Sequence, residues 1–90
     1  VLGLAVPFAT EADALAFVVS ARRNPAVHPR CLEYFDELAF AIARRADGDE
    51  GWARDARAMV YLEETGADEA ADDELPLDAW LALAEAHRAD

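Results

Sequence analysis

Side chains of the types that carry out covalent chemistry are scarce in this sequence. Its candidate nucleophiles are one serine, two threonines and one cysteine: Ser20, Thr10, Thr65 and Cys31. Such a nucleophile works beside a base that activates it. Thr10 is better explained as the cap of a helix, and Cys31 as a small buried apolar residue. We therefore predict no catalytic residue and expect that the protein is not an enzyme.

Two metal-ligand types, His28 and Cys31, stand three residues apart, and His87 is the only further histidine. Structural zinc sites use four ligands in two closely spaced pairs, and the sequence has no second pair. His87 instead fits the end of a helix, where a histidine interacts favourably with the helix dipole. The spacing predicts no metal site.

Carboxylates and cofactor motifs lead to the same expectation. Glu33, Asp36 and Glu37 would form an acidic ridge on a helix, but the Glu-x-x-His motif of di-iron bundles is absent. Gly-x-Gly-x-x-Gly, a phosphate-binding loop and His-Glu-x-x-His are absent as well. We expect no cofactor. A hydrolase with paired carboxylates stays an open alternative, because a sequence does not show pairing in space.

Length and composition predict a single small domain over residues 1–90. Alanine accounts for 22 of the hydrophobic residues and larger types for 27, so the core must be thin and a homodimer stays open as a source of extra burial. The single cysteine forms no internal disulfide, which favours the cytoplasm. No apolar run approaches the roughly eighteen residues that a membrane span needs.

The patterning predicts an all-α fold, a compact bundle of about four short helices at residues 10–23, 30–46, 52–65 and 77–89. Residues 1–8 are apolar and are interpreted as a packing arm or short strand. Residues 66–76 are interpreted as an acidic linker, because they contain hardly any apolar residue that would dock them.

Apolar residues at helical spacing define these four helices. Thr10 and Asp13 approximate a capping box at the start of the first. Trp52 and Trp80 are expected core anchors, with exposure of one of them at an interface as the alternative. The faces expected to be buried are Ala12, Leu15, Ala16 and Val19 in the first helix, widened by Phe17 and Val18; Leu32, Phe35, Leu38, Ala39 and Ile42 in the second, widened by Tyr34 and Phe40; Trp52, Ala56, Met59 and Val60 in the third; and Leu77, Trp80, Leu81, Ala84 and His87 in the fourth.

Charge is distributed unevenly along the chain. The formal net charge is −11. Residues 1–46 contain five acids and five arginines, whereas residues 47–90 contain fourteen acids and three arginines. An acidic half repels nucleic-acid phosphates and anionic membranes and attracts basic surfaces, so we expect no direct nucleic-acid or membrane binding. A solvated face that serves only solubility or salt adaptation is the alternative.

These observations predict a noncatalytic protein–protein interaction module, an acidic inhibitor or adaptor that binds a partner protein with a basic surface. The alternative is a structural or assembly subunit completed by self-association. An enzyme or metal carrier ranks third. The partner-binding residues that we predict are Tyr61, Glu63, Glu64, Asp68, Glu69, Asp72, Asp73 and Glu74.

Overall fold

A computed structural model describes residues 1–48, 51–65 and 76–89. Three strands and three helices alternate along the chain: β1 (Leu2–Phe8), α1 (Glu11–Arg23), β2 (Cys31–Phe35), α2 (Glu37–Asp47), β3 (Ala58–Glu64) and α3 (Leu77–Ala86). The prediction of an all-α bundle is therefore wrong. The described part of the chain is an α/β structure built on one antiparallel sheet.

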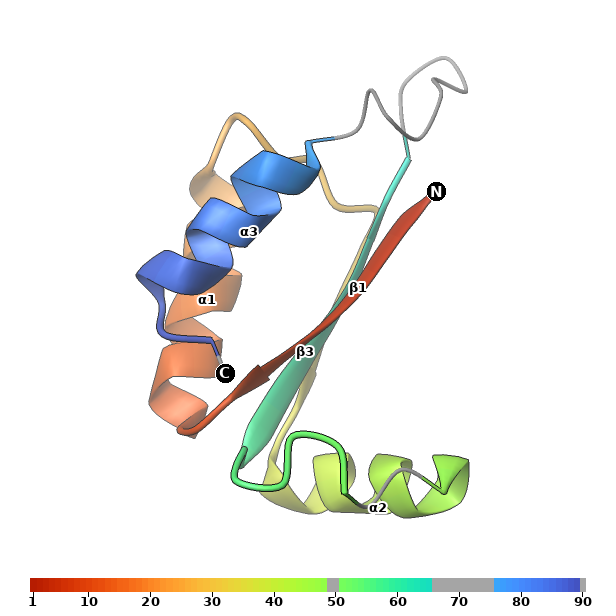
Figure 1. The fold of residues 1–90 in the computed structure, drawn as a ribbon. Helices are drawn as coiled ribbons and strands as arrows, with labels where there is room; N and C mark the ends of the chain where they lie inside the picture. Colours follow the sequence, from red (N-terminus) through yellow and green to blue (C-terminus); the bar gives the residue numbers. More distant parts are fainter. Residues whose placement is uncertain (49–50, 66–75, 90) are drawn as a thin grey trace.

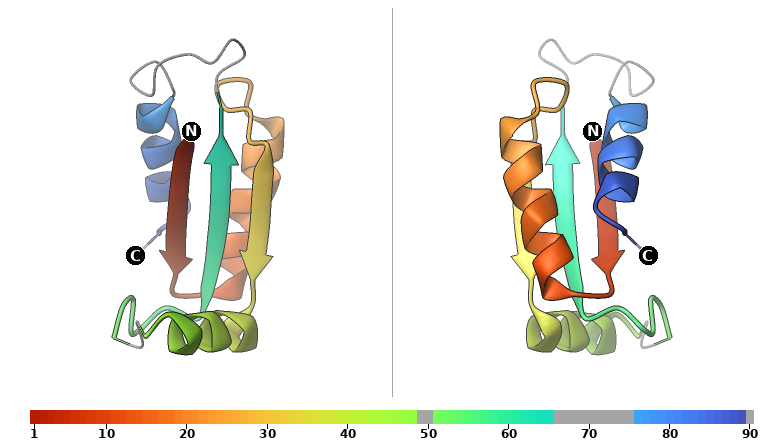
Figure 2. Two further views of the ribbon diagram at one scale, coloured as in Figure 1. Left: turned by 90° about the vertical axis from the view of Figure 1, so that its right-hand side faces the viewer. Right: turned by 90° about the vertical axis from the view of Figure 1, so that its left-hand side faces the viewer.

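The sheet has the strand order β1-β3-β2, so the last strand of the chain lies between the first two (Figure 2). Both pairings are antiparallel, with Leu4 opposite Leu62 and Leu62 opposite Leu32. The three leucines therefore lie side by side across the sheet, although they are about thirty residues apart in sequence. This register decides which side chains share a face.

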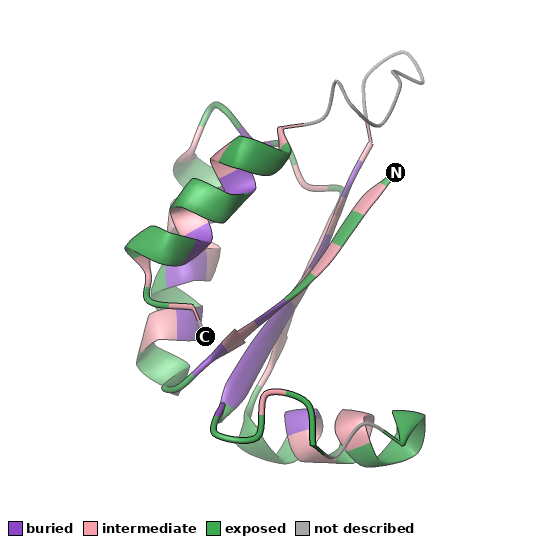
Figure 3. Cartoon of the chain, in the orientation of Figure 1, coloured by how far each residue is buried: buried purple, intermediate pink, exposed green. Residues whose placement is uncertain are grey.

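The three helices are placed very differently with respect to the sheet. Helices α1 and α3 cover one face together, whereas α2 lies across the end of the strands and extends beyond the opposite face (Figure 1). We call the face beneath α1 and α3 the closed face, and the opposite face the open face. Figure 3 shows the buried residues of α1 and α3 on the sides that point toward the sheet.

Strand β1 replaces the expected N-terminal packing arm. Burial alternates along β1. Val6 and Phe8 are buried on the closed face, whereas Ala5 is exposed on the open face. Pro7 has no N–H to donate, and its place on an edge strand avoids the loss of a ladder hydrogen bond. The alternative interpretation of this segment, a short strand, is confirmed.

The helices predicted at 30–46 and 52–65 are wrong over the segments that form β2 and β3. Residues Cys31–Phe35 are a strand, and a helix begins only at Glu37, where the Asp36 carboxylate accepts a hydrogen bond from the Ala39 amide at 2.8 Å. Residues Ala58–Glu64 form the central strand. In both segments apolar residues fit a helical spacing by coincidence, while the actual period is two.

The first and last predicted helices exist. Helix α1 begins after Thr10, whose hydroxyl accepts a hydrogen bond from the Asp13 amide at 3.1 Å, as the capping pattern indicates. Helix α3 follows Pro76, and the remainder of the predicted linker, residues 66–75, lies outside the described residues.

The main core lies between the closed face and the two helices above it. Phe17, Phe8 and Trp80 are almost completely buried there, with ring centroids 5.3 Å apart for Phe8 and Phe17 and 6.0 Å apart for Phe17 and Trp80. The prediction of Trp80 as a core anchor is confirmed. A smaller cluster of Phe40, Ala56 and Met59 packs α2 against the open face.

The main stripe that we predicted for the buried face of α1 is wrong, whereas the inclusion of Phe17 in that face is confirmed. Helix α1 buries Ala14, Phe17 and Ala21, whereas the expected stripe of Ala12, Leu15, Ala16 and Val19 points outward. Leu38, Ile42, Leu77 and Leu81 are also exposed, against expectation. Alanine makes both faces of α1 look apolar, and only the position of Phe17 distinguishes them.

Within the described ranges, no helix combines the length and the apolar character that crossing a membrane would require.

Candidate functional site

The open face carries the polar and aromatic side chains of the sheet. The register sets three rows across it: Gly3, Glu63 and Cys31; Ala5, Tyr61 and Glu33; and Pro7, Met59 and Phe35. Beside the small residues Gly3 and Ala5 of β1, Tyr61 and Glu63 of β3 stay partly accessible, whereas Met59 is buried beneath α2. The open face is the candidate functional site, because it carries these polar and aromatic side chains and is not covered by α1 and α3.

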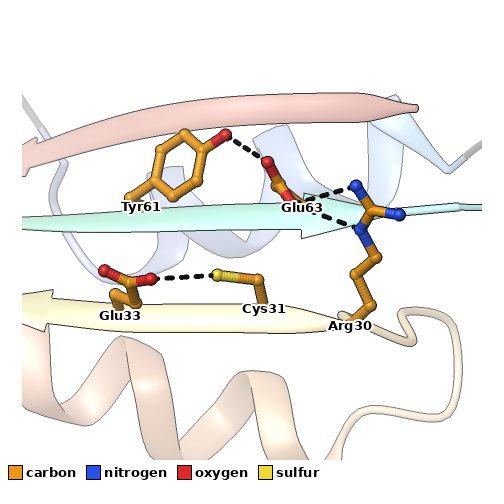
Figure 4. A network of polar contacts seen from close by, with 5 residues as sticks. All are labelled: Arg30, Cys31, Glu33, Tyr61 and Glu63. Carbon is orange, nitrogen blue, oxygen red and sulfur yellow. Dashed lines mark hydrogen bonds and ion pairs between the residues drawn. The ribbon is translucent and has the colours of Figure 1, made fainter.

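Tyr61, Glu63 and Arg30 form a chain of contacts along this face (Figure 4). The Tyr61 hydroxyl donates to Glu63 Oε2 at 2.6 Å. The Arg30 guanidinium contacts the other carboxylate oxygen, Oε1, through Nε at 3.2 Å and through NH2 at 3.1 Å. Both oxygens of Glu63 are therefore occupied, and its carboxylate holds two side chains in place.

This arrangement keeps Tyr61 protonated and Glu63 ionised. The hydrogen bond to the Glu63 carboxylate, followed by partial burial, raises the pKa of Tyr61. The same hydrogen bond and the Arg30 guanidinium lower the pKa of Glu63. A carboxylate with a lowered pKa is a weak base at neutral pH. The pair therefore orients groups on the open face and is poorly suited to proton transfer.

Cys31 lies next to this chain, on β2. Its thiol donates to Glu33 Oε1 at 3.4 Å. Burial first, and then the hydrogen bond and charge of Glu33, raise the pKa of Cys31. A thiol with a raised pKa is a poor nucleophile, because the thiolate is the reactive form. The expectation that Cys31 is a buried apolar residue is wrong, because its side chain is only partly buried and contacts a carboxylate, while the absence of a nucleophilic role stays a prediction.

A cavity of about 520 Å³ lies in the corner between α2 and the open face. All three strands, helix α2 and the loop before β3 contribute to its wall, and we call it the corner cavity. Its lining residues are Ala5, Phe35, Phe40, Ala43, Arg44, Asp47, Trp52, Met59 and Tyr61. Most of them are apolar or aromatic, as in small-molecule sites generally.

Arg44 fixes the loop that carries Trp52. Its NH1 donates to the carbonyl oxygens of Trp52 at 3.1 Å and Ala53 at 2.9 Å, and its guanidinium lies 4.1 Å from the centre of the Phe40 ring. Trp52 meets the same ring edge-on at 5.8 Å. Trp52 thus lines the corner cavity with 43% of its surface exposed, so the prediction that it is a core anchor is wrong. A role for Trp52 at an interface stays a prediction.

The eight predicted partner-binding residues are not brought together in the described structure. Tyr61 and Glu63 lie on the open face, but Glu64 points to the closed face and is only 4% exposed. Its Oε1 accepts hydrogen bonds from the His28 amide at 2.7 Å and from Trp80 Nε1 at 3.1 Å. Asp68, Glu69, Asp72, Asp73 and Glu74 lie outside the described residues. Binding of a basic partner protein stays a prediction.

Apart from Tyr61, which was predicted to bind a partner, sequence reasoning did not assign a binding role to the residues that form the corner cavity, and it missed Arg30. The alternation of large and small residues over residues 2–8 would have identified strand β1, whereas Tyr61-Leu62-Glu63-Glu64 in β3 does not alternate. The position of the cavity had no such signal, because its wall combines five segments. Among the described residues, no group of three or more His, Cys, Asp or Glu side chains is arranged to hold a metal ion.

Comparison with known protein families adds one finding. The family model for the C-terminal domain of FAD linked oxidases matches residues 3–89, almost the whole chain. No curated protein and no solved structure matches.

The family match contradicts the predicted function. It replaces the noncatalytic interaction module, the inhibitor or adaptor and the self-associating structural subunit, and it contradicts the expectation that the protein is not an enzyme. The physical reason is that a flavin carries its own redox chemistry. The protein around it needs neither a nucleophile nor a metal cluster, so the scarcity of reactive side chains did not argue against catalysis.

Proposed function

We propose, because the chain belongs to the family of C-terminal domains of FAD linked oxidases, that it is part of a longer flavin-dependent oxidoreductase. In this protein the open face borders the active site and forms a wall that receives and orients the substrate. The observation that supports this role is the open face itself, on which a polar chain of contacts and an aromatic cavity lie side by side.

The described residues do not fit the dinucleotide part of FAD. A diphosphate is bound by free helix N-termini or by clustered backbone amides. Here each helix carries acids in its first turn: Glu11 and Asp13 in α1, Glu37 in α2 and Asp78 in α3. Thr10 and Asp36 already accept the amides at the first two of these ends. We therefore assign FAD binding to other parts of the longer protein.

The open face supplies orientation and exclusion of water. Phe35, Met59 and Tyr61 present a continuous apolar and aromatic surface, and Glu63 with Arg30 fixes the ring of Tyr61 through its hydroxyl. Rigid groups placed beside a reacting centre lower the entropic cost of reaching the reactive geometry. The oxidation itself is the chemistry that a bound flavin supplies.

The test is to purify the full-length protein in which this chain occurs and to record its visible absorption spectrum. We expect a flavin spectrum, release of FAD on denaturation, and bleaching when an oxidisable substrate is added without oxygen. The Glu63→Gln variant should retain FAD and be reduced more slowly, because the amide has one acceptor oxygen and cannot hold both Tyr61 and Arg30. A full-length protein without flavin would contradict the proposal.

A further inference from the structure

The corner cavity has the size of a small-molecule site and an unusually aromatic wall. Its volume of about 520 Å³ lies within the range of ligand pockets, roughly 300–1,000 Å³. Phe35, Phe40, Trp52 and Tyr61 contribute aromatic rings, and Met59 contributes a flexible thioether side chain. Such a wall gains free energy by removing apolar surface from water and by ring contacts.

Two polar side chains in the cavity wall, Arg44 and Tyr61, already have hydrogen-bond acceptors. Arg44 donates to two backbone carbonyl oxygens and lies over Phe40, and the Tyr61 hydroxyl donates to Glu63. Asp47 adds a negative charge to the wall, in a chain whose net charge is −11. Most of the wall is apolar or aromatic, so an uncharged apolar group gains the most free energy by entering the cavity.

Trp52 lines the cavity from a loop whose backbone conformation is energetically unfavourable. Ala53 has φ = 50°, in the left-handed region that a residue with a Cβ adopts at a cost of about 1 kcal/mol. Two hydrogen bonds from Arg44, to the carbonyl oxygens that precede and follow the Ala53 Cα, maintain this conformation. Strained backbone of this kind is concentrated at functional sites. Arg44 is thus a positioning residue, and Trp52 is the side chain that a ligand would contact.

From this geometry we infer that the corner cavity binds the uncharged apolar part of the substrate, a ring or a branched or extended hydrocarbon chain. The group to be oxidised stays outside the cavity, along the open face. This inference rests on the proposed function and names its substrate class. It assigns Trp52 and Phe40 to substrate specificity, in addition to the general role of the open face.

The experiment uses the full-length flavoprotein and a series of neutral probes: ethanol, 1-butanol, 1-hexanol and cyclohexylmethanol. Ligand-observed NMR titrations give their dissociation constants. We expect each added methylene to tighten binding about fourfold, since burial of one methylene contributes about 0.8 kcal/mol. Trp52→Ala should weaken cyclohexylmethanol binding about tenfold and leave ethanol nearly unchanged.

Two further variants make the result specific. Ala43→Leu places extra volume in the cavity and should weaken the longer probes most, while thermal melting verifies that it is folded. Ile42→Ala is the matched control, because Ile42 lies on the same helix, is 59% exposed and does not line the cavity. Probe affinities in this variant should equal those of the wild type.

The outcomes separate the two proposals. Equal dependence on probe length in wild type, Trp52→Ala and Ala43→Leu, in protein that contains FAD, would overturn the role of the cavity and leave the proposed function intact. Absence of FAD from the wild-type protein, recorded on the same samples before any probe is added, would contradict the proposed function instead.

Discussion

The two faces of the sheet differ in how deeply the side chains of the same strands are buried. On the closed face Val60 and Leu62 are completely buried beneath α1 and α3, whereas on the open face Tyr61 and Glu63 remain partly accessible. The closed face supplies most of the burial that stabilises the fold. Outside the cluster that packs α2 against it, the open face is thereby free to hold groups suited to contact with a ligand.

Glu63 and Glu64 show this difference in two adjacent residues of one type. Glu63 faces outward and fixes Tyr61 and Arg30, while Glu64 faces inward and accepts hydrogen bonds from a loop amide and a core tryptophan. Strand alternation alone separates a residue of the site from a residue of the core.

Phe17→Ala should have the largest effect, because it removes a fully buried ring from the closed-face core. Phe17 contacts Phe8, Trp80 and His87, and the expected loss of unfolding free energy is about 3–5 kcal/mol. Urea unfolding measures it. Leu15→Ala, on the exposed side of the same helix, should cost less than about 1 kcal/mol. Equal losses would mean that α1 does not pack as described.

Glu64→Ala should come next, with a loss of about 1–3 kcal/mol, because the buried Trp80 indole N–H and the partly buried His28 amide lose their acceptor. Glu64→Gln keeps an oxygen acceptor and should recover most of this loss in the same urea experiment. The open-face substitution Glu63→Gln should be milder than Glu64→Ala. If Glu64→Ala were the milder of the two, the assignment of the faces would be contradicted.

Acid should reveal a smaller contribution from Glu63. Its pKa is lowered in the folded chain from the ordinary value of 4.5, so its contribution to stability is present above that value and is lost as the pH falls through the folded pKa. The difference in unfolding free energy between wild type and Glu63→Gln should therefore shrink below about pH 4.5. Urea unfolding at a series of pH values measures this difference, and a constant difference would argue against the contact.

Cys31 should show the smallest effect. Glu33→Gln removes one cause of its raised pKa, but burial, the largest cause, remains. Alkylation by iodoacetamide near neutral pH should therefore become only modestly faster in this variant. Glu37→Gln, which leaves the thiol's neighbours unchanged, is the control. A rate that falls in Glu33→Gln would show that Glu33 does not suppress the thiolate.

Helices were predictable where their signals are local. Thr10 and Asp13 define the start of α1 within four residues, and Leu77 and Trp80 lie in a segment whose apolar spacing is correctly helical. Strands β2 and β3 were missed because their apolar residues fit a helical spacing over a few positions. These residues are Leu32 and Phe35 in β2, and Met59 and Val60 in β3. Nothing within either segment reveals the partner strand that decides otherwise.

Sequence by itself determined the charge asymmetry, the capped first helix, the last helix and the scarcity of reactive side chains. Only the tertiary structure decided that Glu63 contacts both Tyr61 and Arg30, that Glu64 points to the opposite face, and that Trp52 lines a cavity. The physical reason is the range of the interactions. Caps and helical periodicity act within one or two turns, whereas a site at the corner of a sheet is assembled by strand pairing between residues about thirty positions apart.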